Sequence, residues 1–222
     1  MDGPQVHKNF FLDFFQNPWS VAIVLPKDDC SDGTKLHCSG SILSPKFVLT
    51  AAHCFYSEYG PVSKTNMVLI VGASQPTNQT ALSIDKTRRL SQSRKIKRVL
   101  IHPSFNKSTA SAMYDLALVE IQGSFTLKKS IWPICVPDEV RERKHHFRNG
   151  YKLVGFGTDI SDSGQCIECL KSDQLNVQST VYCSTIYGQI LKATFHRDHE
   201  IVKTALPNNF DDDPLICAKV IY

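Results

Sequence analysis

The residue with the clearest chemical potential is His53, which lies in the sequence Thr50-Ala51-Ala52-His53-Cys54. An imidazole is the side chain most often used as a general base near neutral pH. Upstream, two short apolar runs at residues 39–43 and 47–49 are separated by the turn-forming triplet Ser44-Pro45-Lys46. This pattern predicts a β-hairpin or a tight strand pair that leads directly into the histidine.

A cysteine stands at each end of this stretch, Cys38 before the first run and Cys54 immediately after His53. A disulfide between them would hold the strand pair together. Closing a loop of this length is worth roughly 3 kcal/mol in the chain-entropy model. A single histidine is usually an ordinary surface or core residue, but a histidine at the end of a cross-linked, rigid element meets the requirement of a catalytic base.

Two motifs, Cys38-Ser39-Gly40-Ser41 and Thr50-Ala51-Ala52-His53-Cys54, resemble the catalytic-histidine region of the chymotrypsin/trypsin family of serine endopeptidases. The segment Pro18-Trp19-Ser20-Val21 is similar to the start of the first barrel in that family. The resemblance implies an all-β fold of two antiparallel β-barrels of the chymotrypsin type, with the second barrel incomplete. It places the first barrel, with the histidine and aspartate of the triad, at residues 10–130, an inter-barrel linker at 131–149 and a partial second barrel at 150–222.

The second motif is Tyr114-Asp115-Leu116-Ala117-Leu118, continuing to Ile121. Its apolar run suits a strand buried on both faces, with Asp115 at its entrance. An aspartate in such a place usually just closes a turn. In the triad that the resemblance implies, Asp115 accepts the Nδ1 proton of His53 and stabilises the imidazolium, while His53 acts as the general base.

The nucleophile that completes such a triad is not found in the sequence. Members of the family carry it in a Gly-Asp-Ser-Gly-Gly segment, and no Gly-Asp-Ser-Gly occurs anywhere in the 222 residues. Without the serine and the backbone donors of the oxyanion hole, the chain alone is expected not to cleave peptides. The sequence therefore leaves two hypotheses: a serine-type endopeptidase whose serine segment is missing from this chain, or a non-catalytic serine-protease homologue that acts as a binding or regulatory protein.

Composition fits an extracellular globular protein. Apolar residues make up 42% and charged residues 21%, which is enough for a core, and eight cysteines indicate an oxidising compartment. Two N-glycosylation sequons, at Asn78 and Asn106, agree with secretion, although residues 1–5 do not resemble a secretory signal. No run is long enough to span a bilayer. We expect a secreted protein that acts on protein or peptide substrates, with no cofactor, no metal and no membrane partner.

A basic block runs from Lys86 to Arg98 and contains seven Lys or Arg in thirteen positions. Such a block could bind a polyanion such as heparin. The favoured interpretation is a solvated edge strand, because lysine is common on edge strands and limits aggregation there. Nucleic acid is not expected as a partner, because no aromatic residue is interleaved to stack on bases.

Two further groups of residues invite a metal or redox interpretation. His145-His146 together with Cys166 and Cys169 suggests zinc, but the spacing matches no standard site. A redox Cys-x-x-Cys would be expected at a helix N-terminus, whereas this context is all-β. Structural disulfides are the better interpretation of the cysteines, with Cys30 as one candidate partner among those the sequence leaves open, and a solvated linker is the better interpretation of the segment with His145 and His146.

Overall fold

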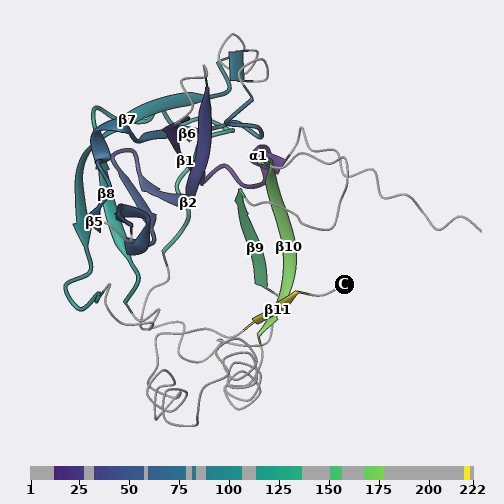
Figure 1. Ribbon diagram of the computed structural model, residues 1–222. Helices are drawn as coiled ribbons and strands as arrows, with labels where there is room; N and C mark the ends of the chain where they lie inside the picture. The colour runs from purple at the N-terminus through teal and green to yellow at the C-terminus, as the bar shows by residue number, and fades with distance from the viewer. Residues whose placement is uncertain are drawn as a thin grey trace, which may run out of the picture. The chain divides into compact units, whose positions relative to one another are not determined.

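The computed structural model describes residues 13–27, 33–57, 60–78, 82–83, 89–106, 114–136, 151–156, 168–177 and 218–220 (Figure 1). Nearly all regular structure in these ranges is β-strand. The helical elements are single turns, α1 (Asp13–Gln16), η2 (Ala52–Phe55) and η3 (Lys64–Asn66). The prediction of an all-β protein is confirmed.

Six strands form a closed antiparallel barrel in the order β1-β2-β3-β8-β7-β6. Closing a sheet on itself removes both edges, so this part of the chain presents no row of unpaired strand backbone. The strands are β1 (Ser20–Pro26), β2 (Thr34–Ser44), β3 (Phe47–Thr50), β6 (Val68–Val71), β7 (Gln92–Ile101) and β8 (Ala117–Ile121).

The hairpin predicted from the apolar runs is present as β2 and β3. They pair antiparallel with Ser41 opposite Leu49, and Pro45 and Lys46 form the connection. Gly40 lets the two backbones approach closely, because a Cβ at that position would lie 2.8 Å from the carbonyl oxygen of Leu49. The small residue in the Cys-Ser-Gly-Ser motif is therefore a packing requirement of the hairpin.

Strand β1 is buried on both faces, and this organises the core. Val21 and Ile23 belong to one face and Ala22 and Val24 to the other, and all four are fully buried. The second face packs in a separate apolar cluster, whose buried members are Phe14, Ala22, Val24, Ile70, Ala73, Leu82, Phe156 and Leu170. Phe14 of α1 thus contributes to the core from the amino-terminal part of the chain.

Two strand predictions were wrong in detail. The basic block was expected to be an edge strand, but β7 lies between β6 and β8 in the closed barrel, pairing with β6 through its first half and with β8 through its second. Strand β8 was expected to be buried on both faces, but its side chains alternate between buried and half-exposed. Barrel closure gives β7 a neighbour on each side in place of an edge, and the outward side chains of β8 stay half-exposed.

Strands β9 (Tyr151–Phe156), β10 (Leu170–Val177) and β11 (Ala218–Val220) form a second sheet in the order β11-β10-β9, and β4 (Tyr56–Ser57) pairs with β5 (Gly60–Pro61). The chain divides into two compact units. The first comprises 1–102, 116–137 and 154–172 and includes the closed barrel, and the second comprises 103–115, 138–153 and 173–222. Among the described residues, no helix is both long and apolar enough to cross a membrane.

Among the described cysteines, Cys38 is bonded to Cys54 and Cys135 is an exposed thiol. Cys169 also belongs to a disulfide, and its partner lies outside the described residues. The expected roles of Cys30 and Cys166, like those of His145 and His146, fall on residues that the structure does not describe.

Candidate active site

His53 lies on the one-turn helix η2, directly after β3. Its neighbours Ala52, Cys54 and Phe55 are buried, whereas the imidazole is exposed. The buried flanks fix the backbone of the turn, so the histidine is presented to solvent from an element that is itself part of the core. The short Ala51-Ala52 sequence makes this possible, because small side chains let the turn pack closely against the barrel.

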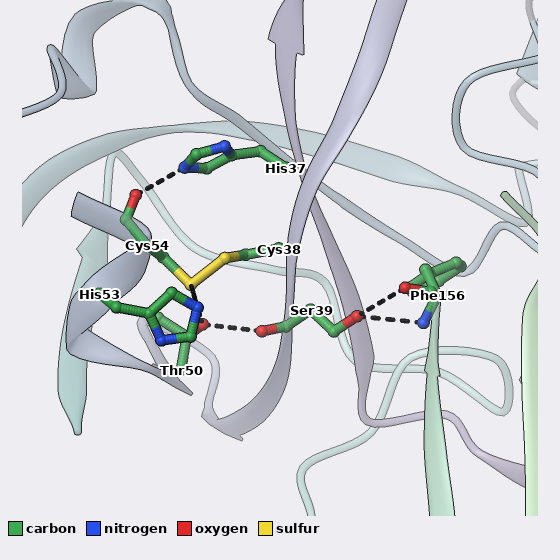
Figure 2. Close-up of a disulfide and its surroundings, with 7 residues drawn as sticks. All are labelled: His37, Cys38, Ser39, Thr50, His53, Cys54 and Phe156. Atoms are coloured by element: carbon green, nitrogen blue, oxygen red, sulfur yellow. Dashed lines mark hydrogen bonds between the residues drawn. A yellow bond between two sulfur atoms is a disulfide. The ribbon is translucent and has the colours of Figure 1, made fainter. Parts of the chain in front are cut away.

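The predicted cross-link between Cys38 and Cys54 is confirmed. The disulfide joins β2 to η2 with the two Cα atoms 6.2 Å apart, within the usual range for such bonds. Figure 2 shows the His53 ring beside it, with Nε2 3.9 Å from the Sγ of Cys54. The cross-link therefore ends at the residue next to the candidate base.

Two hydrogen bonds reinforce the disulfide. The Nε2 of His37 donates to the carbonyl oxygen of Cys54 over 2.6 Å, and the Oγ1 of Thr50 donates to the carbonyl oxygen of Ser39 over 2.7 Å (Figure 2). Each of them connects β2 to the segment that carries His53. The helical turn is thus fastened to β2 at Cys54 by the disulfide and by the hydrogen bond from His37, while the Thr50 hydrogen bond fastens the end of β3, which leads into the turn, to β2.

His37 is a residue that the sequence analysis missed. The sequence did offer one indication of its role, because His37 immediately precedes the half-cystine Cys38 in the strand predicted to pair with the segment leading to His53. The contact needs an N–H at Nε2, which sets the tautomer of neutral His37 because a carbonyl oxygen can only accept.

Ser39 connects the hairpin to a more distant part of the chain. Its Oγ accepts a hydrogen bond from the backbone N–H of Phe156 over 3.0 Å and donates to the carbonyl oxygen of the same residue over 3.4 Å. One hydroxyl thereby satisfies both backbone groups of a buried residue at the end of β9. This serine is therefore a structural partner in the fold, and the sequence did not indicate its role.

Asp115 lies two residues before β8 and is half-exposed. The register pairs Ala117 of β8 with Thr50 of β3, and His53 follows Thr50 by three residues. Asp115 belongs to the second compact unit, whereas His53 belongs to the first. Tyr114, just before the aspartate, has a φ of 57°, a left-handed backbone conformation that non-glycine residues seldom adopt outside constrained sites.

The disulfide and His53 form a cluster of potential metal-ligand atoms. Cys38, His53 and Cys54 bring a nitrogen and two sulfur atoms within 4.8 Å of one another. Both sulfur atoms are bonded to each other, however, and a cysteine binds a metal as the thiolate. The group is therefore a disulfide with a histidine beside it, and its chemistry does not suit a metal ion.

Comparison with known proteins agrees with this geometry. The model of the family Trypsin matches residues 14–202 of the chain, which therefore belongs to the trypsin family, and the closed barrel with a second partial sheet is consistent with the trypsin fold. A venom serine protease of Polistes dominula is 27% identical over 153 residues, covering 69% of this chain and 50% of that protein.

Two other relatives show the same level of similarity. Ovochymase-2 of Mus musculus is 26% identical over 187 residues, covering 83% of this chain and 26% of that protein. Coagulation factor IX of Oryctolagus cuniculus is 24% identical over 185 residues, covering 76% of this chain and 58% of that protein. The matches thus span between about a quarter and three fifths of these relatives.

Proposed function

We propose that the protein is a serine-type endopeptidase in which His53 is the general base and Asp115 orients it, with the nucleophilic serine supplied by a segment outside the 222 residues. The observation that carries this proposal is the attachment of η2. A disulfide and the hydrogen bond from His37 hold it to β2 at Cys54, and the Thr50 hydrogen bond holds the end of β3 just before it, while the imidazole stays exposed. A base in acyl transfer needs this combination of a fixed backbone and an accessible ring.

The proposed roles follow from the two nitrogens of His53. A carboxylate that accepts the Nδ1 proton leaves Nε2 to take the proton of an attacking hydroxyl and then deliver it to the leaving amine. What supports this pairing is that both residues stand in motifs that resemble the family's, within the range matched by the Trypsin family model. Nε2 faces the disulfide here, and because the ring is exposed, rotation of the side chain can direct it to a hydroxyl.

The proposal extends to substrates, location and partners. We infer that the substrates are proteins or peptides and that the protein is secreted, as the names of a venom protease and a coagulation factor among its relatives suggest. A disulfide in the barrel supports an oxidising compartment. We also propose a polyanion such as heparin as a partner of the basic block from Lys86 to Arg98, in which 86–88 lie outside the described residues.

The second candidate is a non-catalytic homologue that acts as a binding or regulatory protein. What favours it is the absence of a Gly-Asp-Ser-Gly segment from the sequence. The intact motifs around His53 and Asp115 favour the peptidase, because a protein that only binds has no need of an exposed histidine on a cross-linked turn.

Reaction of the natural gene product with a fluorophosphonate probe separates the two candidates. The probe forms a covalent bond only with an activated serine, so the peptidase should be labelled and its His53→Ala variant should lose about 10³-fold or more of the labelling rate. His37→Phe tests the attachment of the turn separately: it removes the hydrogen bond to Cys54 but keeps the base, so its labelling should be slower than that of the parent and faster than that of His53→Ala. An unlabelled, folded natural product would support the non-catalytic homologue.

A further inference from the structure

A β-bulge on β7 gives the basic block an unusual local geometry. The register with β8 runs from Ile96 opposite Ile121 directly to Arg98 opposite Glu120, so Lys97 is an extra residue with no partner on β8. Ile96 is buried in the barrel, whereas Lys97 and Arg98 are both exposed. The bulge thus interrupts the in–out alternation of the strand and turns two consecutive cations to the outside.

Both cations share one carboxylate. Lys97 Nζ lies 2.8 Å from Glu120 Oε1 and Arg98 Nη2 lies 3.0 Å from Glu120 Oε2. The side chain of Glu120 is only 13% exposed, while those of Lys97 and Arg98 are 63% and 59% exposed. The carboxylate is therefore covered by two cations that still offer most of their surface to solvent.

The charge balance at this position is positive. The hydrogen bond from Lys97 and the charges of Lys97 and Arg98 hold the pKa of Glu120 below its ordinary value, against the opposing effect of partial burial. Glu120 is consequently ionised at neutral pH and neutralises one of the two cations, which leaves one positive charge in excess.

Two further lysines extend this surface. Lys95 precedes the bulge and is exposed, and Lys64 of η3 is exposed and donates from Nζ to the carbonyl oxygen of Lys97 over 3.3 Å. Glu120 is the only acidic residue on β6, β7, β8 and η3 within the described ranges. We call this set the β7 basic surface: Lys64, Lys95, Lys97, Arg98 and Glu120.

Arg94 belongs to the same sequence block but not to this surface. Its guanidinium lies 5.8 Å from the ring centroid of Phe125 and donates to the carbonyl oxygen of Ser124, to that of Ser93 and to the side chain of Gln92. It is therefore engaged in holding the 124–126 loop to β7. Arg94 is half-buried by these contacts, whereas the cations of the β7 basic surface remain exposed and can contact a partner.

We propose that the β7 basic surface binds a sulfated polysaccharide, and that Glu120 limits the affinity by competing with the sulfates for Lys97 and Arg98. This proposal deepens the heparin partnership proposed above and does not depend on catalysis. A polysaccharide fits better than an acidic polypeptide strand, because β7 is already paired with β6 and β8 and the carbonyl oxygen of Lys97 accepts from Lys64. Recognition is left to side-chain cations, which bind tetrahedral oxyanions without needing backbone pairing.

The test measures the dissociation constant of the full chain for a heparin oligosaccharide of defined length at neutral pH and about 0.15 M salt, where exposed charges are screened beyond roughly 8 Å. Lys97→Gln and Arg98→Gln should each weaken binding about two- to fivefold, and Glu120→Gln should strengthen it by a similar factor. Lys27→Gln is the matched control. It removes one exposed lysine just beyond the end of β1, which β6 separates from β7.

The signs of these changes decide the outcome. Binding that tightens in Glu120→Gln, weakens in Lys97→Gln and is unaffected by Lys27→Gln supports the proposal. An unchanged or weaker affinity in Glu120→Gln overturns it, as does an equal loss in Lys27→Gln, which would reveal an effect of net charge alone. Equal affinity for a polyglutamate of the same charge would also overturn it, in favour of an acidic polypeptide. Thermal melts check that each variant is folded, and none of these measurements requires peptidase activity.

Discussion

Removal of the Cys38–Cys54 disulfide should destabilise the protein by about 3 kcal/mol. The bond closes a loop with a sequence separation of 16, and the chain-entropy model gives about 3 kcal/mol for a loop of that size. The appropriate change is Cys38→Ala with Cys54→Ala, because Cys54 is only 2% exposed and a serine would bury a hydroxyl. A loss of that size is a large part of the 5–15 kcal/mol by which proteins of this kind are usually stable.

Urea unfolding followed by tryptophan fluorescence measures this loss, with the slope of the transition compared between the two proteins. Cys135→Ala is the control, since it removes an exposed thiol and should leave the midpoint unchanged. Amide hydrogen exchange should also quicken at Ala52–Phe55, because the disulfide and the hydrogen bond from His37 together attach that turn to β2. A loss below about 1 kcal/mol, with exchange unaltered, would refute the conclusion that the disulfide holds η2 in place.

Three further substitutions test other contacts of the first compact unit. Gly72→Ala should lower the free energy of unfolding by about 2 kcal/mol or more, because Gly72 has a φ of 67° and a Cβ there would collide with the carbonyl oxygen of Leu90. Gly123→Ala is its control and should cost only about 1 kcal/mol, because Gly123 has a similar φ of 77° but nothing lies within 4 Å of the added Cβ. Ser39→Ala should cost about 1–3 kcal/mol by urea unfolding, since the buried Phe156 loses both partners of its backbone, and no loss would contradict that role. Glu120→Gln should lower the melting temperature at pH 7, because the lowered pKa of Glu120 makes its ionised form stabilising above the unfolded value of about 4.3. The difference should shrink as the pH falls below that unfolded value and be lost once Glu120 is protonated in the folded protein, and a difference that does not shrink with falling pH would refute this cause.

The local elements around His53 were predictable from the sequence, because their signals are short-range. Alternating apolar runs, a Ser-Pro-Lys turn and two flanking cysteines determine the hairpin and its cross-link without knowledge of the rest of the fold. The family resemblance carried by Thr50–Cys54 and Cys38–Ser41 then gave the all-β architecture, which the strand content and the family match confirm.

The features that depend on closure of the barrel could not be predicted from the sequence. A lysine-rich strand looks the same at an edge or between two neighbours, and only the pairing of β7 with β6 and β8 decides between them. The bulge at Lys97 and the sharing of Glu120 also need the register, since the two segments are more than twenty residues apart in sequence. His37 and Ser39 were missed because each acts through a backbone group that is distant in the chain.

The most direct test of the account is whether Asp115 orients His53. The histidine Nδ1 proton should give a strongly deshielded resonance in the NMR spectrum of the ¹⁵N-histidine-labelled protein, because a proton held between imidazole and carboxylate is in a charge-assisted hydrogen bond. If Asp115 orients His53, this resonance is assigned to His53 by its loss in His53→Ala, disappears in Asp115→Asn and persists in His37→Phe. A His53 Nδ1 proton that is unaltered in Asp115→Asn would contradict the proposed catalytic pair.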